Sequence, residues 1–175
     1  MAQGRSQSRP LVVAPLLALA IALGMAKPSP AADAPGGLVS LRRVTVLVDL
    51  EHPIDPVSVE DLLARVEEAL RGADPPLAIH EAVTDRIRLI VAVGPVSATT
   101  LRGFWLPLSG TYGIGSVRLA VERLVTLPGA PRPLTATVWQ TERRVAGSWR
   151  TIGPETIHIV NEVLAELLDA RRQVR

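Results

Sequence analysis

The first regular element of the chain is marked by strict alternation of apolar and polar side chains. From Val44 to Leu50 every second residue is valine or leucine, which is the period of a strand with one buried face. His52 and Pro53 interrupt the alternation, and proline is a strong turn signal. The pattern therefore predicts a strand over residues 44–50.

Beyond this break the apolar residues are spaced by three and four, as in a helix. Between Val59 and Leu70 they fall on one stripe, which is typical of a helix that packs against a core. Ser58, followed three residues later by Asp61, forms a variant of the capping box. Gly72 supplies a stop. We expect a helix that opens at Ser58 and stops at Gly72.

A short apolar piece at residues 77–79 and three longer alternating segments predict the remaining strands. Residues 87–93 become apolar on both faces, so this strand is expected at the centre of the sheet. The next two run over about 115–125 and 134–142, with the turn at 128–131 between them. Because no helix separates these three strands, we expect an antiparallel meander.

The chain closes with a second helix, expected to begin near Pro154 because proline suits a first helical turn. Arg171, Arg172 and Arg175 lie at its end, where positive charge favours the helix dipole. The element order is β-α-β-β-β-β-α. It predicts an α+β fold, a two-layer sandwich with a mostly antiparallel sheet and two helices on one face.

The amino terminus has the three parts of a secretory signal peptide. Arg5 and Arg9 precede an apolar run over residues 11–26, and a small, proline-rich stretch follows. This run is shorter than the roughly 20 residues that span a bilayer as a helix. Export to the periplasm is therefore the predicted destination.

Signal cleavage is expected after Ala26 or Ala32. The chain then divides into a signal peptide over residues 1–32, a flexible linker over 33–40 and a single α+β domain over 41–175. With the signal removed, no permanent membrane span is expected. An uncleaved signal that tethers the domain to the inner membrane is the alternative.

Charge changes this picture in one respect. The chain has 19 Lys+Arg against 17 Asp+Glu, a net charge of +2. Arg5, Arg9 and Lys27 belong to the predicted signal, and without them 16 basic and 17 acidic residues remain. A domain with so little net charge has no summed field to attract a polyanion, so we do not expect nucleic acid as a partner. The chain has no cysteine, which excludes disulfides, thiolate metal sites and lipid attachment through a thiol.

The connection over residues 94–115 is long for a link between two strands, and such loops are often functional. It contains Arg102, Phe104, Trp105 and Tyr112, and thus three of the five aromatic residues of the chain. Aromatic side chains beside an arginine are typical of contact surfaces. We expect this loop to contact a partner or, alternatively, to fold back and cap an open end of the core.

Trp139 is a second candidate contact residue. Alternation along its strand places Thr135, Thr137, Trp139 and Thr141 on one side. If the helices cover the other side, Trp139 is expected on a bare sheet surface that a partner can reach.

Motifs for catalysis, metals and cofactors are scarce. Asp49, Glu51 and His52 carry suitable metal ligands, but strand alternation puts His52 opposite the two carboxylates, which favours a polar strand exit. The glycines of residues 110–115 lack the helix start that a phosphate loop needs, and are expected to serve turns or a bulge. No catalytic residue, metal site or cofactor is predicted.

Three segments carry a resemblance: RVTVLVDLEHPIDPVSVEDLLARVEEALRGA, GIGSVRLAVERLVTL and LTATVWQTERRVAG. Together with the closing helix, they resemble small uncharacterised exported proteins of Gram-negative bacteria. At the level of the fold, residues 41–170 are also similar to the amino-terminal domain of TolB and to periplasmic activators of penicillin-binding proteins. The resemblance implies a protein-interaction module of the envelope, and it transfers no functional residue.

These observations predict an exported periplasmic protein that is a non-enzymatic binding or accessory domain. Its expected partner is an envelope protein, contacted through the 94–115 loop and the open sheet face. A small-ligand-binding protein with a pocket under the same loop is the first alternative, and a cofactor-free hydrolase is the second.

Overall fold

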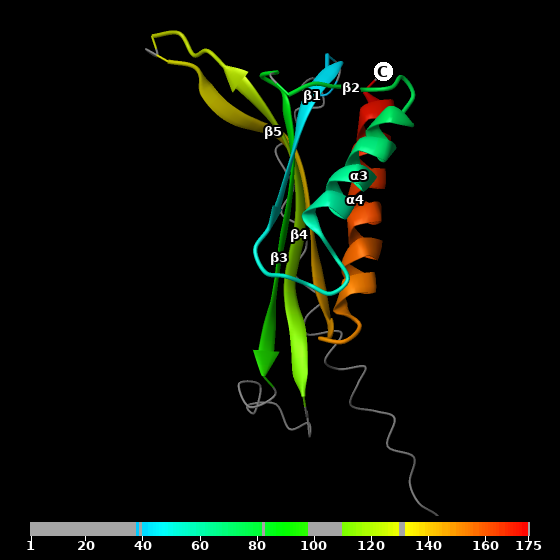
Figure 1. Cartoon of the computed structure of the whole chain (residues 1–175). Helices are drawn as coiled ribbons and strands as arrows, with labels where there is room; N and C mark the ends of the chain where they lie inside the picture. Colours follow the sequence, from blue (N-terminus) through cyan, green and yellow to red (C-terminus); the bar gives the residue numbers. More distant parts are fainter. Residues whose placement is uncertain (1–37, 39, 82, 98–109, 130–131, 175) are drawn as a thin grey trace, which may run out of the picture.

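The computed structural model describes residues 38, 40–81, 83–97, 110–129 and 132–174. Their elements follow the predicted order of strands and helices (Figure 1). In chain order they are β1 (Arg43–Leu50), α3 (Val59–Arg71), β2 (Ala78–Ile79), β3 (Arg86–Ser97), β4 (Thr111–Val125), β5 (Leu134–Ser148) and α4 (Ile152–Gln173).

The sheet has the strand order β2-β1-β3-β4-β5. The α+β class and the central place of β3 are thus confirmed. The sheet is mixed, however, because β1 pairs in parallel with both β2 and β3, whereas β3, β4 and β5 are antiparallel. The expectation of a mostly antiparallel sheet is therefore wrong. The physical reason is that α3 carries the chain back to the end of the sheet where β1 begins, so that the next strand runs parallel to β1, as in a helical crossover.

Both helices pack on the same face of the sheet, as predicted (Figure 1). Cross-strand pairs such as Val48 with Leu89 and Val91 with Val117 place apolar side chains in register on this face. Val160, Val163 and Leu167 of α4 are among the fully or almost fully buried residues that meet them. The core therefore lies between this face of the sheet and the apolar stripes of the helices.

The start of α3 depends on the predicted cap. The Ser58 hydroxyl oxygen accepts a hydrogen bond from the Asp61 backbone N–H at 3.0 Å and donates to the Asp61 carboxylate at 2.8 Å. The carboxylate thus bonds the Ser58 hydroxyl, where a full capping box would have it accept the Ser58 N–H. At the other end, the Gly72 N–H closes the helix on the Glu68 carbonyl.

The expected long loop over residues 94–115 is shorter than predicted. Strand pairing continues to Ser97 opposite Thr111, so both ends of the segment belong to a β3–β4 hairpin. The central stretch, residues 98–109, lies outside the described residues. Polar and proline residues at the ends of these strands interrupt the apolar alternation, so the pattern did not show how far β3 and β4 extend.

Two glycines allow β4 to approach its neighbours closely. A Cβ at Gly115 would lie 1.9 Å from the Ala92 carbonyl oxygen and 2.6 Å from Val93 Cα. A Cβ at Gly113 would lie 2.6 Å from the Ile152 side chain, at the start of α4. These residues therefore serve close packing within a strand, which differs from the turn or bulge expected for them.

Arg171 joins three separate parts of the chain. Its side chain donates to the Pro75 carbonyl at 2.6 Å and to the Leu41 carbonyl at 3.4 Å, and the residue is buried. The first carbonyl follows α3 and the second precedes β1. Arg171 thus does more than the predicted complement to the helix dipole: it fixes the end of α4 to the sheet and to α3.

We predict that Gly115→Ala lowers the free energy of unfolding by about 3 kcal/mol, because the new methyl group meets backbone that cannot turn aside. Chemical denaturation of the two proteins measures this loss. Gly147→Ala is the matched control, since Gly147 pairs with Gly113 on the next strand and a Cβ there meets nothing closer than 3.5 Å. The control should change stability by no more than about 1 kcal/mol, and equal losses in both variants would contradict the prediction.

We predict that Arg171→Met lowers the free energy of unfolding by about 2–3 kcal/mol, because it leaves two backbone carbonyls without their donor. The control Arg172→Met removes an exposed arginine that bonds Asp169 at 3.0 Å, and should cost less than about 1 kcal/mol. Urea unfolding followed by circular dichroism compares them. If Arg172→Met lowers the free energy of unfolding as much as Arg171→Met does, then Arg171 stabilises the protein only through its charge, and its bonds to the two carbonyls add nothing.

Candidate interaction surface

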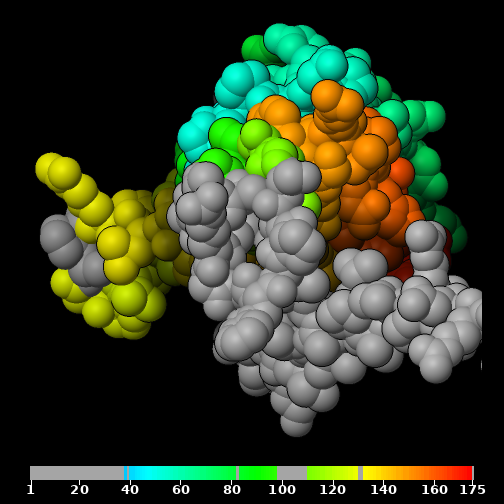
Figure 2. All heavy atoms as spheres, turned by 90° about the horizontal axis from the view of Figure 1, so that it is seen from below, coloured from blue at the N-terminus to red at the C-terminus, as the bar shows by residue number. Residues whose placement is uncertain are grey.

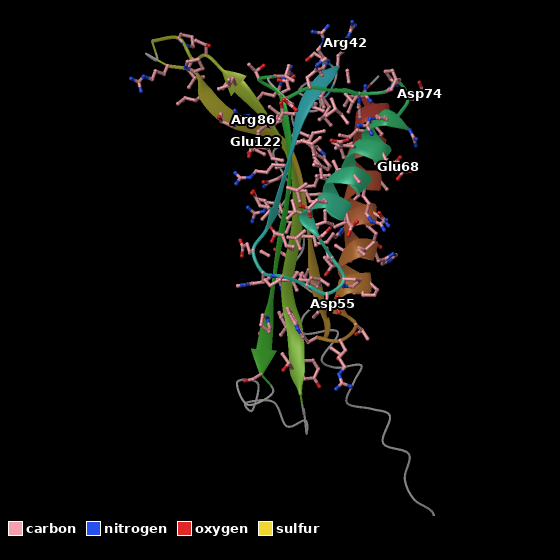
Figure 3. The ribbon with its side chains drawn as sticks, viewed as in Figure 1. Arg42, Asp55, Glu68, Asp74, Arg86 and Glu122 are labelled. Atoms are coloured by element: carbon pink, nitrogen blue, oxygen red, sulfur yellow. The ribbon has the colours of Figure 1, made fainter. Side chains whose placement is uncertain are left out.

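One face of the sheet has no described helix on it, and we call it the open face. The register of the strands defines its members, because cross-strand partners point to the same side. Figure 3 shows two of them, Arg86 and Glu122, on the side of the sheet away from the helices. The open face comprises Thr45, Leu47 and Asp49 of β1; Arg86, Arg88, Ile90, Ala92, Gly94 and Val96 of β3; Tyr112, Ile114, Ser116, Arg118, Ala120, Glu122 and Leu124 of β4; and Thr135, Thr137, Gln140, Glu142, Arg144, Ala146 and Ser148 of β5.

Two ion pairs on the open face join charged side chains of neighbouring strands. Arg88 donates from Nε to the Asp49 carboxylate at 2.7 Å, and this hydrogen bond raises the pKa of Arg88. Arg118 donates to a single oxygen of Glu142 at 2.9 and 3.2 Å. Opposite charges on neighbouring strands stabilise a sheet modestly, and here they also hold the long side chains in fixed positions.

Glu142 lies close to the charges of two arginines, Arg118 and Arg144. A hydrogen bond from the Ser116 side chain, the guanidinium of Arg118 and the charge of Arg144 together hold the pKa of Glu142 below its usual range. Its carboxylate is therefore charged at neutral pH. Glu142 and Arg144 both belong to β5, the last strand in the order of the sheet.

The far end of the β4–β5 hairpin bends toward the open side. In Figure 1 it leans away from the helices, and in Figure 2 it stands out from the rest of the described chain. Between its base, β1 and the residues Glu81, Val83 and Thr84 lies a hollow of about 440 Å³. The hollow is lined by Thr45, Leu47, Glu81, Val83, Thr84, Arg86 and Leu124.

Several large apolar side chains remain accessible around this hollow and along the open face. Leu47 is 37% exposed, Leu124 43% and Ile114 36%. Tyr112 is half-buried on β4, between Val96 and Ser148. Apolar side chains among fixed charges on an uncovered sheet are a composition suited to contact with another molecule.

The base of the hairpin is held by an arginine that sequence reasoning did not single out. Arg123 donates to both oxygens of Asp85, each at 2.9 Å, and to the Ser40 hydroxyl at 2.9 Å. These three residues are far apart in the sequence. Only their distance in space, which the strand register sets, could have revealed the contact.

The expected position of Trp139 on the open face is wrong. Trp139 pairs with Val121, whose side chain is fully buried on the helix-covered face, and the tryptophan packs against the core. The register shifts between Val121 and Glu122, so that Val138 is an extra residue in β5 and forms a bulge. The bulge puts Thr137 on the open face and Trp139 on the other, so the residues that alternation had placed on one side of β5 lie on both sides.

The other predicted contact residues have mixed outcomes. Tyr112 lies on the open face, in strand β4 and outside any loop. Arg102, Phe104 and Trp105 lie outside the described residues. The strand exit that carries Glu51 and His52 reaches the same face, because a Cβ at Gly94 would lie 3.1 Å from the His52 ring.

The described part of the chain brings no three His, Asp or Glu side chains together in a way that could hold a metal ion. His158 lies on α4, 3.4 Å from Glu162 one turn later, and both side chains are largely exposed. Among the described helices, none has the length and apolar character needed to cross a membrane.

Comparison with known proteins gives similarity of structure only. No family model matches the chain, and no curated protein matches it. Among solved structures, the hypothetical protein CT253 from Chlamydia trachomatis has a TM-score of 0.43 at 10% identity, covering 74% of this chain and 97% of that one. A point variant of PelC from Paraburkholderia phytofirmans, solved as a dodecamer, has a TM-score of 0.43 at 14% identity and covers 73% of this chain and 86% of that one.

Proposed function

We propose that this chain is an exported periplasmic protein that binds another protein of the cell envelope and has no catalytic activity of its own. The proposal of export rests on the sequence of residues 1–32, with its basic start, apolar run and small residues before the expected cleavage sites. The proposal of binding rests on the open face.

The single observation that carries the binding role is the one-sided packing of the fold. Both helices cover the same face of a five-stranded sheet, and the open face keeps Leu47 and Ile114 more than a third exposed. Burial of such side chains supplies the free energy of association. The fixed ion pairs beside them supply orientation and selectivity, which charged groups at interfaces mainly provide.

The chemistry of the open face favours a protein partner. Its charges alternate in sign across the strands, as in the pairs of Arg88 with Asp49 and Arg118 with Glu142. A polyanion such as nucleic acid selects a surface of one sign. A folded protein with its own mixed charges suits this face, and the resemblance to interaction modules of the envelope points to the same class of partner.

A second candidate function is small-ligand binding, which the hollow at the base of the β4–β5 hairpin favours. Its walls combine apolar Leu47, Val83 and Leu124 with the charged groups of Glu81 and Arg86. A volume of about 440 Å³ falls within the range of ligand sites. The two functions are separable, because a ligand would raise the unfolding temperature of the purified domain whereas a protein partner must be supplied from the envelope.

We predict that Leu47→Glu and Ile114→Glu each reduce recovery of the specific envelope partner by about tenfold or more, because each places a charge where an apolar contact is buried on binding. The tagged protein is cross-linked in its own cells, captured and compared with wild type by quantitative mass spectrometry. Thermal unfolding of each purified variant checks that the fold is kept.

The matched control is Val59→Glu. Val59 is 39% exposed, close to the 37% of Leu47, but it begins α3 on the helix side of the molecule. Its partner recovery should equal that of wild type. An open-face variant that recovers the same proteins in the same amounts as the control would refute the binding role of this face.

We predict that the full chain, expressed with a carboxy-terminal tag in a Gram-negative host, is recovered from the periplasm with Lys27 or Asp33 as its first residue. Osmotic-shock fractionation and intact mass measure location and cleavage together. Leu17→Arg, which interrupts the apolar run, should keep the uncut chain in the cytoplasm. Wild-type protein of full mass in the cytoplasm contradicts export, and full mass in the inner membrane supports the tethered alternative.

A further inference from the structure

The outer side of β5 is an unpaired strand edge within the described chain. The strand runs from Leu134 to Ser148 and lies last in the sheet, and among the described strands it pairs with β4 alone. Such an edge presents a row of backbone donors and acceptors, which is a template for one more strand. After the bulge at Val138, the residues from Trp139 onward pair regularly with β4.

The hydrogen bonds of β5 show which residues face outward. The Trp149 N–H donates to the Thr111 carbonyl on the β4 side at 3.0 Å. In an antiparallel pair alternate residues direct their N–H and C=O to opposite sides. The backbone groups of Gln140, Glu142, Arg144 and Ala146 therefore point away from the sheet.

We propose that β5 pairs with β5 of a second copy of this chain, antiparallel and about a two-fold axis at Arg143. In this register Glu142 of each copy lies opposite Arg144 of the other, and Gln140 lies opposite Ala146. Two-fold symmetry makes each contact occur twice. The result is a continuous sheet made of both five-stranded sheets, whose two open faces lie on one side and whose helices lie on the other. This inference goes beyond the proposed function and does not depend on it.

Charge selects this register over its neighbours. Partner residues must lie on the same face of the joined sheet, so the axis moves in whole-residue steps along β5. An axis at Glu142 would put two carboxylates opposite each other, and an axis at Arg144 would do the same with two guanidinium groups. Each of the three axes places one like-charged pair at the axis itself, including the two Arg143 residues, but only the axis at Arg143 also forms two Glu142–Arg144 pairs. Such opposite charges across strands are favourable.

The helix-covered side of the same register is also compatible. There Trp139 lies opposite Gly147, a large residue against one without a side chain, and Thr141 lies opposite Val145. The two Arg143 residues meet at the axis, but each is bonded by Glu166 on α4 of its own copy, with Nε donating at 2.9 Å. This ion pair reduces the repulsion between the two Arg143 side chains at the axis.

The absence of cysteine from the chain makes the axis directly testable. The backbone groups of Arg143 face β4, so the two Arg143 residues at the axis would form a non-hydrogen-bonded pair across the new edge. The Cα atoms of such a pair are about 4.5 Å apart. That separation lies within the range of disulfides. Arg143→Cys should therefore cross-link to itself on mild oxidation, giving a dimer on a non-reducing gel, whereas Arg144→Cys, opposite Glu142, should not.

A charge exchange tests the same register without cysteine. Sedimentation of the tag-free protein over about 1–100 µM should show wild type in a monomer–dimer equilibrium. Glu142→Arg and Arg144→Glu should each weaken dimerisation by about tenfold or more, because each places two like-charge pairs across the edge. The double variant, in which the two charges are exchanged, should restore it.

Each alternative outcome overturns a defined part of the proposal. A wild-type domain that stays monomeric throughout this concentration range, with no cross-link at position 143, shows that the charges protect the edge from pairing. A dimer that the single variants do not weaken lies at another surface. A dimer whose cross-link forms at position 144 has a different axis. Thermal unfolding of every variant separates these outcomes from a damaged fold.

Discussion

Each strand of the sheet sends one set of side chains toward α3 and α4 and the other set to the opposite side. The period is two, so a shift of one residue in any strand would exchange the two sets. The fully buried row from Ile87 to Val93 on β3, with Val117 to Val121 on β4, leaves no freedom for such a shift. The arrangement of both faces, and of the strand edge at β5, follows from this fixed register.

Local patterns predicted most elements because their signals lie within a few residues. Three such signals are the alternation of β1, the cap of α3 by Ser58 and the apolar run on both faces of β3. Each reflects a local preference that the folded structure keeps. The direction of β1 relative to β3 has no such signal. It depends on α3 carrying the chain back across the sheet, and strand periodicity is the same in parallel and antiparallel pairs.

The candidate surface was harder to predict, because one inserted residue decides which side of the sheet a side chain takes. Val138 has no partner on β4. Every later residue of β5 therefore lies on the face opposite to the one that simple alternation from Thr135 and Thr137 predicts. Trp139 consequently packs against the core instead of lying on the open face. Tyr112, which was expected in the loop, lies on the open face because β4 extends to Thr111. Contacts such as Arg123 with Asp85 join distant segments and have no sequence pattern of their own.

Electrostatics and apolar contact have different roles on the open face. Arg88 with Asp49, and Arg118 with Glu142, already satisfy each other, so a partner gains little free energy by replacing water around them. In the proposed complex, these ion pairs keep the charges in a pattern that the surface of the partner must match. In the proposed complex, the free energy of binding comes from the apolar groups between these pairs, above all Leu47 and Ile114. A net charge near zero fits this division, since the proposed recognition depends on local alternation of charge and not on a summed field.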